Sequence, residues 1–285
     1  MVTVDLLKQH NVLCVYAETN TPSDDYQLHC HNHYEVYYLL EGPVSYLAEG
    51  TCYEPQPHTL MVFPPRLFHG VKVLSDAPYK RYTMFFRDTS LPLELRSFLL
   101  SVFPTGQDLL HQPLYFSDAS DLHLEPFFEA LIRCEQLDPA VRTAMSAAYL
   151  QATLGQLTML RTPTAPPTPS VKEQRVLDVL HYLNDHLEET ISLDSLSARF
   201  FLSKNYLNTI FKETTGTTIA GYLNHKRIIR AQQLLFDGYR ATDAATAVGF
   251  TDYSAFFRSY EKILGHSPSQ DKGNPVSSVL FTPSH

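Results

Sequence analysis

The stretch LDSLSARFFLSKNYLNTIFKETTG (residues 193–216) returns in altered form as ATDAATAVGFTDYSAFFRSYEKILG (residues 241–265). Each stretch has a short helical run with small residues, a tight turn, a polar N-cap at Ser203 or Asp252, and a second helical run closed by glycine. Apolar side chains in the second runs recur three and four residues apart, so one face is buried and the other exposed. Small residues allow two helices to cross closely. The pattern therefore predicts two helix-turn-helix units.

Between the two units, residues 218–238 predict a single helix with Lys226, Arg227 and Arg230 near its middle. A rigid connecting helix would fix the two units relative to each other. Two recognition helices ~34 Å apart can enter successive major grooves on one face of DNA. The repeat therefore indicates a DNA-binding domain.

The motifs LxSLSxxxxLSxxYLxxxFKxxxG, YLxxxRIxxAxxLL and AxAVGFxDxSxFxRxxxKxxGxSP occur in this order over the C-terminal part of the chain. In these motifs the sequence resembles the AraC/XylS-type transcriptional regulators. Two positions depart from that family. SPSQDK (residues 267–272) replaces the usual tyrosine-arginine pair after SP, so we expect a short or frayed last helix, and Tyr260 replaces a common Phe, which we expect to affect packing only.

The resemblance implies DNA contacts on the exposed faces of both second helices. They are Lys204, Asn205, Asn208, Thr209 and Lys212 in the first unit, and Tyr253, Ser254, Arg258 and Lys262 in the second. Asn can pair bidentately with adenine and Arg with guanine, whereas Lys suits phosphates, which position without specifying. For each of these side chains alone, an ordinary solvated helix surface is the alternative.

The bulk composition is that of a folded soluble protein, with 285 residues, 44% hydrophobic and 18% charged. We expect a cytoplasmic protein, because no apolar window approaches the ~18 residues of a membrane span and the N-terminus lacks a secretory signal. Four scattered cysteines suit a reducing compartment. Residues 1–170 carry 10 basic and 18 acidic side chains and residues 171–285 carry 12 of each, so charge alone does not indicate nucleic acid.

Composition shifts divide the chain. Four prolines in TPTAPPTPS (residues 162–170) predict an interdomain linker, with an ordinary loop as the alternative. Short aromatic and β-branched runs in residues 1–90 predict the strands of a sandwich or barrel. Residues 91–161 show helical spacing, and their Ala- and Leu-rich last helix needs a partner, either its own sheet or a second copy, so we expect dimerisation here. Residues 171–272 predict an all-helical domain, followed by a tail, residues 273–285.

In HCHNHYEVYYLLEG (residues 29–42), alternate residues of a strand share one face, so His29, His31, His33 and Glu35 project together. The run fits the cupin signature HxHxxxE, and PPRLFH, ending in His69, resembles the second cupin motif, although Arg66 replaces its glycine. The resemblance implies a cupin-like sensor barrel. Three imidazoles and a carboxylate also suit Zn, Fe, Mn or Ni.

Three interpretations of this histidine run stay open: a metal-dependent cupin enzyme, a metal-assisted effector site, and a metal-free effector pocket. We expect the metal-free pocket, with no cofactor required. Its predicted residues are His29, His31, His33, Glu35, Tyr37 and His69. The strand aromatics, with Arg66 or Arg81, would suit a sugar, although most of them are as easily explained as core.

The sequence thus predicts a two-domain protein, a cupin-like all-β barrel with following helices and then an all-α double helix-turn-helix domain. The predicted function is sequence-specific transcriptional regulation in response to a small molecule, with a sugar as the candidate effector, and without catalysis. We expect promoter DNA, an effector, RNA polymerase for an activator, and a second copy of the chain as partners, and no membrane. The alternative is a metal-dependent cupin enzyme with an appended helical interaction domain.

Overall fold

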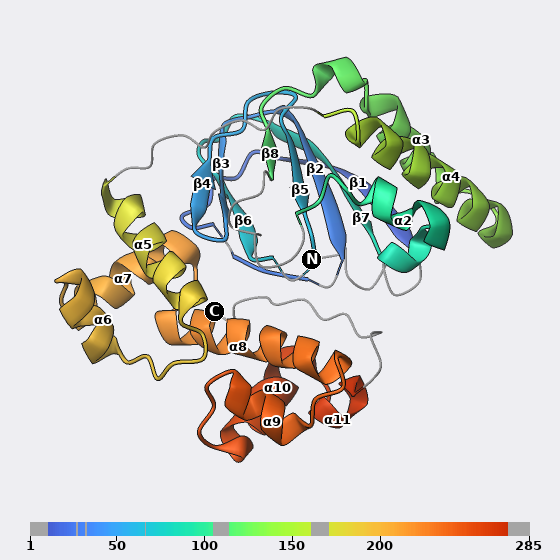
Figure 1. Ribbon diagram of the computed structural model, residues 1–285. Coiled ribbons are helices and arrows are strands. Elements are labelled where there is room, and N and C mark those ends of the chain that lie inside the picture. The colour runs from blue at the N-terminus through green and yellow to red at the C-terminus, as the bar shows by residue number, and fades with distance from the viewer. Residues whose placement is uncertain are drawn as a thin grey trace.

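The protein has a β-rich N-terminal domain followed by a helical C-terminal domain, as predicted (Figure 1). The computed structural model describes residues 11–26, 28–31, 33–65, 67–104, 114–160 and 171–272. The predicted linker, the predicted tail and Arg66 lie outside these residues. Among the described residues, no helix is long and apolar enough to cross a membrane.

Two antiparallel sheets form the N-terminal domain. The larger has the strand order β1-β7-β2-β5-β8, and its strands are Val12–Thr19 (β1), Tyr34–Glu41 (β2), Leu60–Phe63 (β5), Tyr79–Phe86 (β7) and Tyr115–Phe116 (β8). The smaller has the order β4-β3-β6, and its strands are Val44–Ala48 (β3), Thr51–Tyr53 (β4) and His69–Val73 (β6). The strand β8 lies within residues 91–161, which we predicted as helical, because pairing with β5 extends the large sheet past residue 90.

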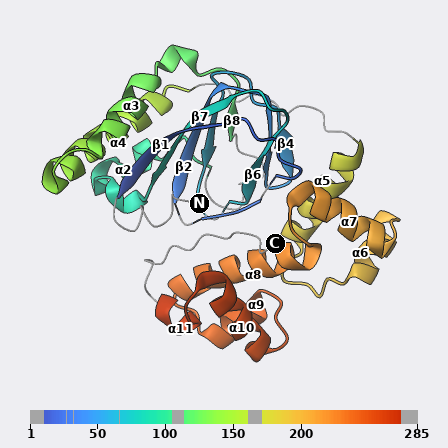
Figure 2. The same cartoon turned by 180° about the vertical axis from the view of Figure 1, so that it is seen from behind.

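Alternation along the strands separates two apolar cores. On β7, Tyr82, Met84 and Phe86 face the helices that cover the large sheet, whereas Tyr79 belongs to the core shared with the small sheet. The covering helices are Leu93–Leu99 (α2), Glu125–Cys134 (α3) and Pro139–Leu157 (α4). A short 3-10 turn precedes α2 at Asp88–Ser90 (η1), and another precedes α3 at Ser120–Leu122 (η3). In Figure 2 the pair α3 and α4 lies on the side of the large sheet away from the small sheet.

The C-terminal domain consists of helices only, within the part of the chain that is described. They are Val171–Asp185 (α5), Leu193–Phe200 (α6), Lys204–Thr215 (α7), Ile219–Phe236 (α8), Ala241–Ala247 (α9), Tyr253–Leu264 (α10) and Pro268–Asp271 (α11). The helix α7 begins at an N-cap, Ser203, and ends at Gly216 in the left-handed region, which glycine adopts without strain. Asp252 caps α10 in the same way. The pairs α6–α7 and α9–α10 are the two predicted helix-turn-helix units, and α8 connects them.

The last helix is short, as the SPSQDK departure predicted, but its end is held firmly. Asp271 is 1% exposed, and its Oδ2 atom accepts hydrogen bonds from Tyr260 Oη at 2.5 Å and Gln232 Nε2 at 3.0 Å, while His266 Nε2 lies 2.6 Å away. The hydroxyl of Tyr260 therefore does more than pack, which corrects our expectation. A buried carboxylate with these partners fixes α10 and α11 to α8.

The first helix-turn-helix unit shares an apolar core with the barrel. Tyr26, Leu28 and Phe68 of the barrel lie in one buried cluster with side chains of α5, α7 and α8. The second unit packs on the C-terminal half of α8 in a separate cluster, which contains no barrel residue among those described. Figures 1 and 2 both show α5 beside the small sheet and α9 to α11 farther from it. The N-terminal domain thus docks on the first unit.

Candidate functional site

Four side chains converge inside the barrel, and we call them the histidine cluster: His29, His31, Glu35 and His69. One ligand atom from each lies within 4.8 Å of the others. His31 and Glu35 meet at the N-terminal end of β2, where His31 Nε2 lies 2.7 Å from Glu35 Oε2. A backbone bridge between His29 and His69 brings the second cupin motif alongside. The structure therefore brings together the four residues that the two motifs predicted.

The hydrogen bonds of the imidazoles fix which nitrogen atoms face the centre. His31 Nδ1 lies 3.2 Å from the carbonyl oxygen of His33, and His69 Nδ1 lies 2.9 Å from that of Leu67. A carbonyl oxygen can only accept, so each Nδ1 carries a proton. Both Nε2 atoms point at Glu35 Oε2, at 2.7 and 3.0 Å. A neutral imidazole would present a lone pair there, so a proton or a cation between these atoms would make the contacts favourable.

Two sources of that positive charge are chemically available. Either each ring carries a second proton and donates to the carboxylate, or a divalent cation takes the three atoms together with His29. The donor set of three imidazoles and one carboxylate fits Zn, Fe, Mn or Ni, and backbone carbonyls that orient metal-binding histidines are a common second layer. The cluster residues therefore fit a metal ion, whereas the expectation that no cofactor is required stays a prediction.

The surroundings of the cluster are apolar and aromatic. Phe63 stacks on His69 with ring centroids 4.2 Å apart, and Phe85 meets His31 edge-on at 5.6 Å. Burial raises the pKa of Glu35, but the charge of His69 and the hydrogen bonds from both histidines outweigh it, so the pKa lies below its ordinary value. These contacts thus favour the ionised form of the buried Glu35 carboxyl.

Two of the predicted pocket residues lie beside the cluster rather than in it. His33 is buried and stacks on His31 with centroids 5.6 Å apart. Tyr37 accepts a hydrogen bond from Tyr79 Oη at 3.2 Å and packs on Tyr46 in the core between the sheets. All six predicted pocket residues therefore lie in the interior of the barrel, and the four of the histidine cluster are in contact with one another.

Arg81, which we weighed for effector binding, lies on the same face of β7 as Tyr79. Its guanidinium carbon lies 4.3 Å from the centre of the Tyr79 ring. Its Nη1 atom is buried and has no hydrogen-bond partner among the residues that the structure describes. An unsatisfied buried donor is costly, so this atom is available for an acceptor group of a ligand. A separate surface pocket of about 230 Å³, between β1 and α4, is lined by Asn11, Val12, Thr89, Ser90, Pro139, Arg142, Thr143, Ser146 and Ala147.

The predicted DNA-contacting side chains lie on the outer faces of α7 and α10. In α7, Leu207, Ile210 and Phe211 are buried, and the predicted contacts occupy the opposite face. Eight of the nine predicted contacts are exposed and Asn208 is half-buried. Lys204 forms an ion pair with Asp194 of α6, which holds its ammonium beside the start of α7. The structure thus presents two polar helix faces attached to one connecting helix.

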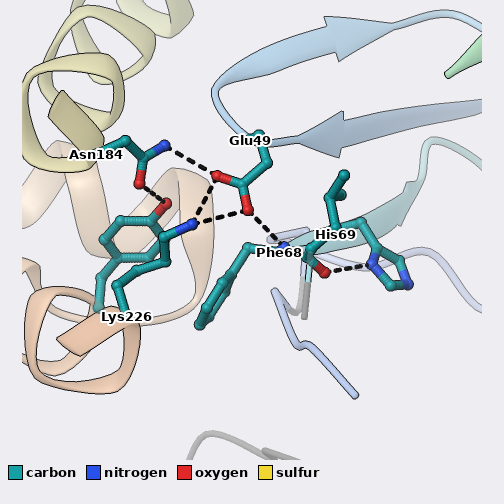
Figure 3. A network of polar contacts seen from close by, with 7 residues as sticks. Glu49, Phe68, His69, Asn184 and Lys226 are labelled. Carbon is teal, nitrogen blue, oxygen red and sulfur yellow. Dashed lines mark hydrogen bonds and ion pairs between the residues drawn. The ribbon is translucent and has the colours of Figure 1, made fainter. Parts of the chain in front are cut away.

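Sequence reasoning missed the contacts that join the two domains. Glu49, in the turn after β3, receives hydrogen bonds from Lys226 Nζ at 2.9 Å and from Asn184 Nδ2 at 2.9 Å (Figure 3). The pattern placed Lys226 at the middle of a connecting helix, where a basic residue suggests no particular partner. Because the two charged residues lie 177 positions apart, only the folded chain reveals the pair.

Comparison with known proteins agrees with this division. A family model described as the AraC-like ligand binding domain matches residues 11–180, more than half of the chain. A second model, described as a helix-turn-helix domain, matches residues 196–273.

Curated relatives match the C-terminal part. An uncharacterized response regulatory protein of Staphylococcus epidermidis is 33% identical over 94 residues, which are 33% of this chain and 38% of that protein. The uncharacterized HTH-type transcriptional regulator YijO of Escherichia coli is 33% identical over 91 residues, 31% of this chain and 32% of that protein. The chain therefore spans less than two fifths of the curated relatives that it matches.

Solved structures show two kinds of overlap. The DNA-binding domain of AdpA, in complex with a target DNA, is 26% identical, with a TM-score of 0.33, over 34% of this chain and 89% of that chain. Apo ToxT K231A from Vibrio cholerae is 11% identical, with a TM-score of 0.36, over 91% of this chain and 96% of that chain. On the two family models, this chain belongs to the AraC family of transcriptional regulators, with an AraC-like ligand binding domain followed by a helix-turn-helix domain.

Proposed function

We propose that this chain is a cytoplasmic, sequence-specific DNA-binding regulator, and not an enzyme, whose barrel senses a small molecule. The observation that carries the proposal is the pair of exposed polar faces on α7 and α10, both fixed to α8. Two such faces on one rigid connection can follow successive major grooves. A regulator needs only differential binding of its effector to two states, so catalysis is not required.

Promoter fragments from the gene's own neighbourhood test this proposal with the full chain. We expect sequence-selective binding whose affinity falls steeply as salt rises, because lysines on both faces displace counterions from phosphates. Equal, weak binding to every fragment at all salt concentrations would refute it.

In the first recognition helix, α7, we expect different side chains to contact the bases and the phosphates. We expect Asn208→Ala to cost about 1–3 kcal/mol of discrimination between operator and scrambled DNA, because an amide can pair bidentately with adenine. Lys212→Ala should weaken binding to both DNAs alike and flatten the salt dependence. Gel-shift or anisotropy titrations on both DNAs at two salt concentrations separate these outcomes. Similar losses of discrimination in both variants would contradict the assignment.

For the sensor we propose that the histidine cluster is the ligand site and that a divalent cation can occupy it. Support comes from the two Nε2 atoms that converge on Glu35 Oε2 while both Nδ1 atoms are used by carbonyls. Arg81 and the tyrosines of the barrel interior would bind hydroxyl or carboxylate groups of an effector. That the effector is a sugar stays a prediction. The alternative function, a metal-dependent cupin enzyme, would also bind the cation but would not require binding to an operator.

We also propose that the protein acts as a homodimer through α4. One row of α4 residues lies at alternating spacings of four and three, as in a coiled-coil contact. Its members are apolar or small, and all are exposed except half-buried Gly155: Val141, Met145, Ala148, Ala152 and Gly155. Exposed Met159 continues the spacing just past the end of α4. The opposite face of α4 is buried against the barrel through Leu150, Leu154 and Leu157. The row is therefore available to a second copy.

Met145→Glu tests this contact. We expect dimerisation to weaken by about tenfold or more, because a charge in an apolar interface has no partner. Leu74→Glu is the matched control, since Leu74 is 51% exposed on the barrel, away from α4. Analytical ultracentrifugation of the full chain measures both. Equal dissociation constants for the two variants and the parent would place the interface elsewhere.

A further inference from the structure

The chain that enters the histidine cluster has two faces with different neighbours. We call residues 26 and 28–31 the strap. His29 and His31 point to the cluster, whereas Tyr26, Leu28 and Cys30 lie in the core shared with the helical domain. Alternation in extended chain explains the split, because successive side chains point to opposite sides. One short segment therefore belongs to the sensor and to the domain interface at once.

The strap also closes the end of the first recognition helix. The last carbonyl groups of a helix have no partner within it. Here Tyr26 N donates to the carbonyl oxygen of Thr214 and Leu28 N to that of Thr215, each at 3.3 Å. Thr214 and Thr215 form the last turn of α7. The strap therefore supplies main-chain caps to the helix that is proposed to read DNA.

The strap lies close against β6, next to a cluster residue. Gly70 follows His69, and a Cβ atom at Gly70 would lie 2.0 Å from the carbonyl oxygen of Tyr26. A backbone approach this close admits only glycine. The position of the strap is therefore fixed by the same strand that supplies His69.

A buried ion pair forms a second link between the cluster and the helical domain. Phe68 N donates to Glu49 Oε1 at 2.8 Å, and Lys226 Nζ lies 2.9 Å from both Glu49 oxygens (Figure 3). The side chains of Lys226 and Glu49 are 14% and 8% exposed. Phe68 precedes His69, and its ring meets His225 of α8 edge-on at 5.2 Å. The backbone of Phe68, next to His69, is thus hydrogen-bonded to Glu49, whose negative charge is paired with Lys226 of α8.

We propose that the strap and the Glu49–Lys226 pair couple the histidine cluster to the first recognition helix. The backbone conformation that presents His29 and His31 to a ligand also places the N–H groups of Tyr26 and Leu28 on the end of α7. A ligand in the cluster therefore strengthens the docking of α7, and docking strengthens ligand binding by the same factor. This inference rests on the proposed role of the cluster as the ligand site.

Hydrogen exchange on the full chain tests the coupling from both ends. Lys226→Met should speed exchange of the strap amides by about tenfold, because it leaves the buried Glu49 without its charge partner. In the other direction, His31→Ala should speed exchange in residues 214–222. Gly70→Ala keeps all charges but displaces the strap, and it should speed exchange in both segments.

Matched controls separate coupling from general destabilisation. Lys80→Met removes a lysine that pairs with Glu41 at 2.8 Å on the outside of the barrel, and His58→Ala removes a histidine outside the cluster. Both variants should leave the exchange rates of the strap and of residues 214–222 as they are in the parent. The coupling would be refuted if hydrogen exchange became faster only in the element that carries the substitution. It would also be refuted if the control variants changed the exchange rates as much as the test variants do. Operator binding by the parent is scored separately, so a protein that binds no DNA refutes the proposed function without altering the exchange result.

Discussion

Glu35→Ala is expected to lower the affinity of the full chain for Zn²⁺ or Co²⁺ by at least about 100-fold, because removing even an outer partner of a metal ligand costs 10–100-fold. Glu35 is the only carboxylate in the cluster, and its Oε2 atom lies within 3.0 Å of two imidazole nitrogens. Without it, the three histidines offer no negative charge to balance a divalent cation. Calorimetric titration, or the visible absorption of bound Co²⁺, measures the loss.

Glu54→Ala is the control for this experiment, since Glu54 is an exposed acidic residue of the same domain. It should bind the cation as the parent does. The cation site is wrong if Glu35→Ala keeps the parent's affinity, or if the parent itself binds no divalent cation. In the second case the cluster is a metal-free site, held by the contacts of Glu35 with His31 and His69.

Acid is expected to destabilise the protein from pH 6.5 downwards, through His225 of α8. Burial, together with the charge of Lys226, lowers the pKa of His225 from 6.5 to about 3. The folded state therefore keeps this imidazole neutral while the unfolded chain takes up a proton. Because the unfolded state binds more protons in this window, the free energy of unfolding falls as the pH falls, by up to ~1.4 kcal/mol per pH unit.

Denaturant unfolding between pH 6.5 and 4.5 isolates this effect. The pKa of Glu35 is also lowered, but from 4.5, so its contribution to the free energy of unfolding is lost only below that pH. His225→Gln removes the titrating group and should flatten the pH dependence in the upper window. An unchanged slope in this variant would show that other groups cause the acid sensitivity. Since His225 lies against Phe68 and Cys30 of the barrel, the same experiment reports on the domain interface.

Much of the fold could be predicted because its signals are local. Ser203 and Asp252 cap the starts of α7 and α10, and Gly216 ends α7, so each signal lies next to the helix that it delimits. The strands β2, β3, β5, β6 and β7 follow runs that alternation and turn residues predict. The short strand β8 could not be predicted this way, since two residues carry no period and only pairing with β5 defines it. Likewise, the burial of Asp271 depends on partners from α8 and α10.

The sequence by itself determined which residues share a face. The spacing of His29 and His31 sets their common direction, and the helical period sets the polar faces of α7 and α10. What each face meets was decided only by the tertiary structure. The other side of the strap packs on the DNA-binding domain, and Glu49 finds Lys226 across 177 positions of sequence. The physical reason is that side-chain period is a property of the local backbone. The neighbour of a buried face depends instead on how distant segments remove apolar surface from water together.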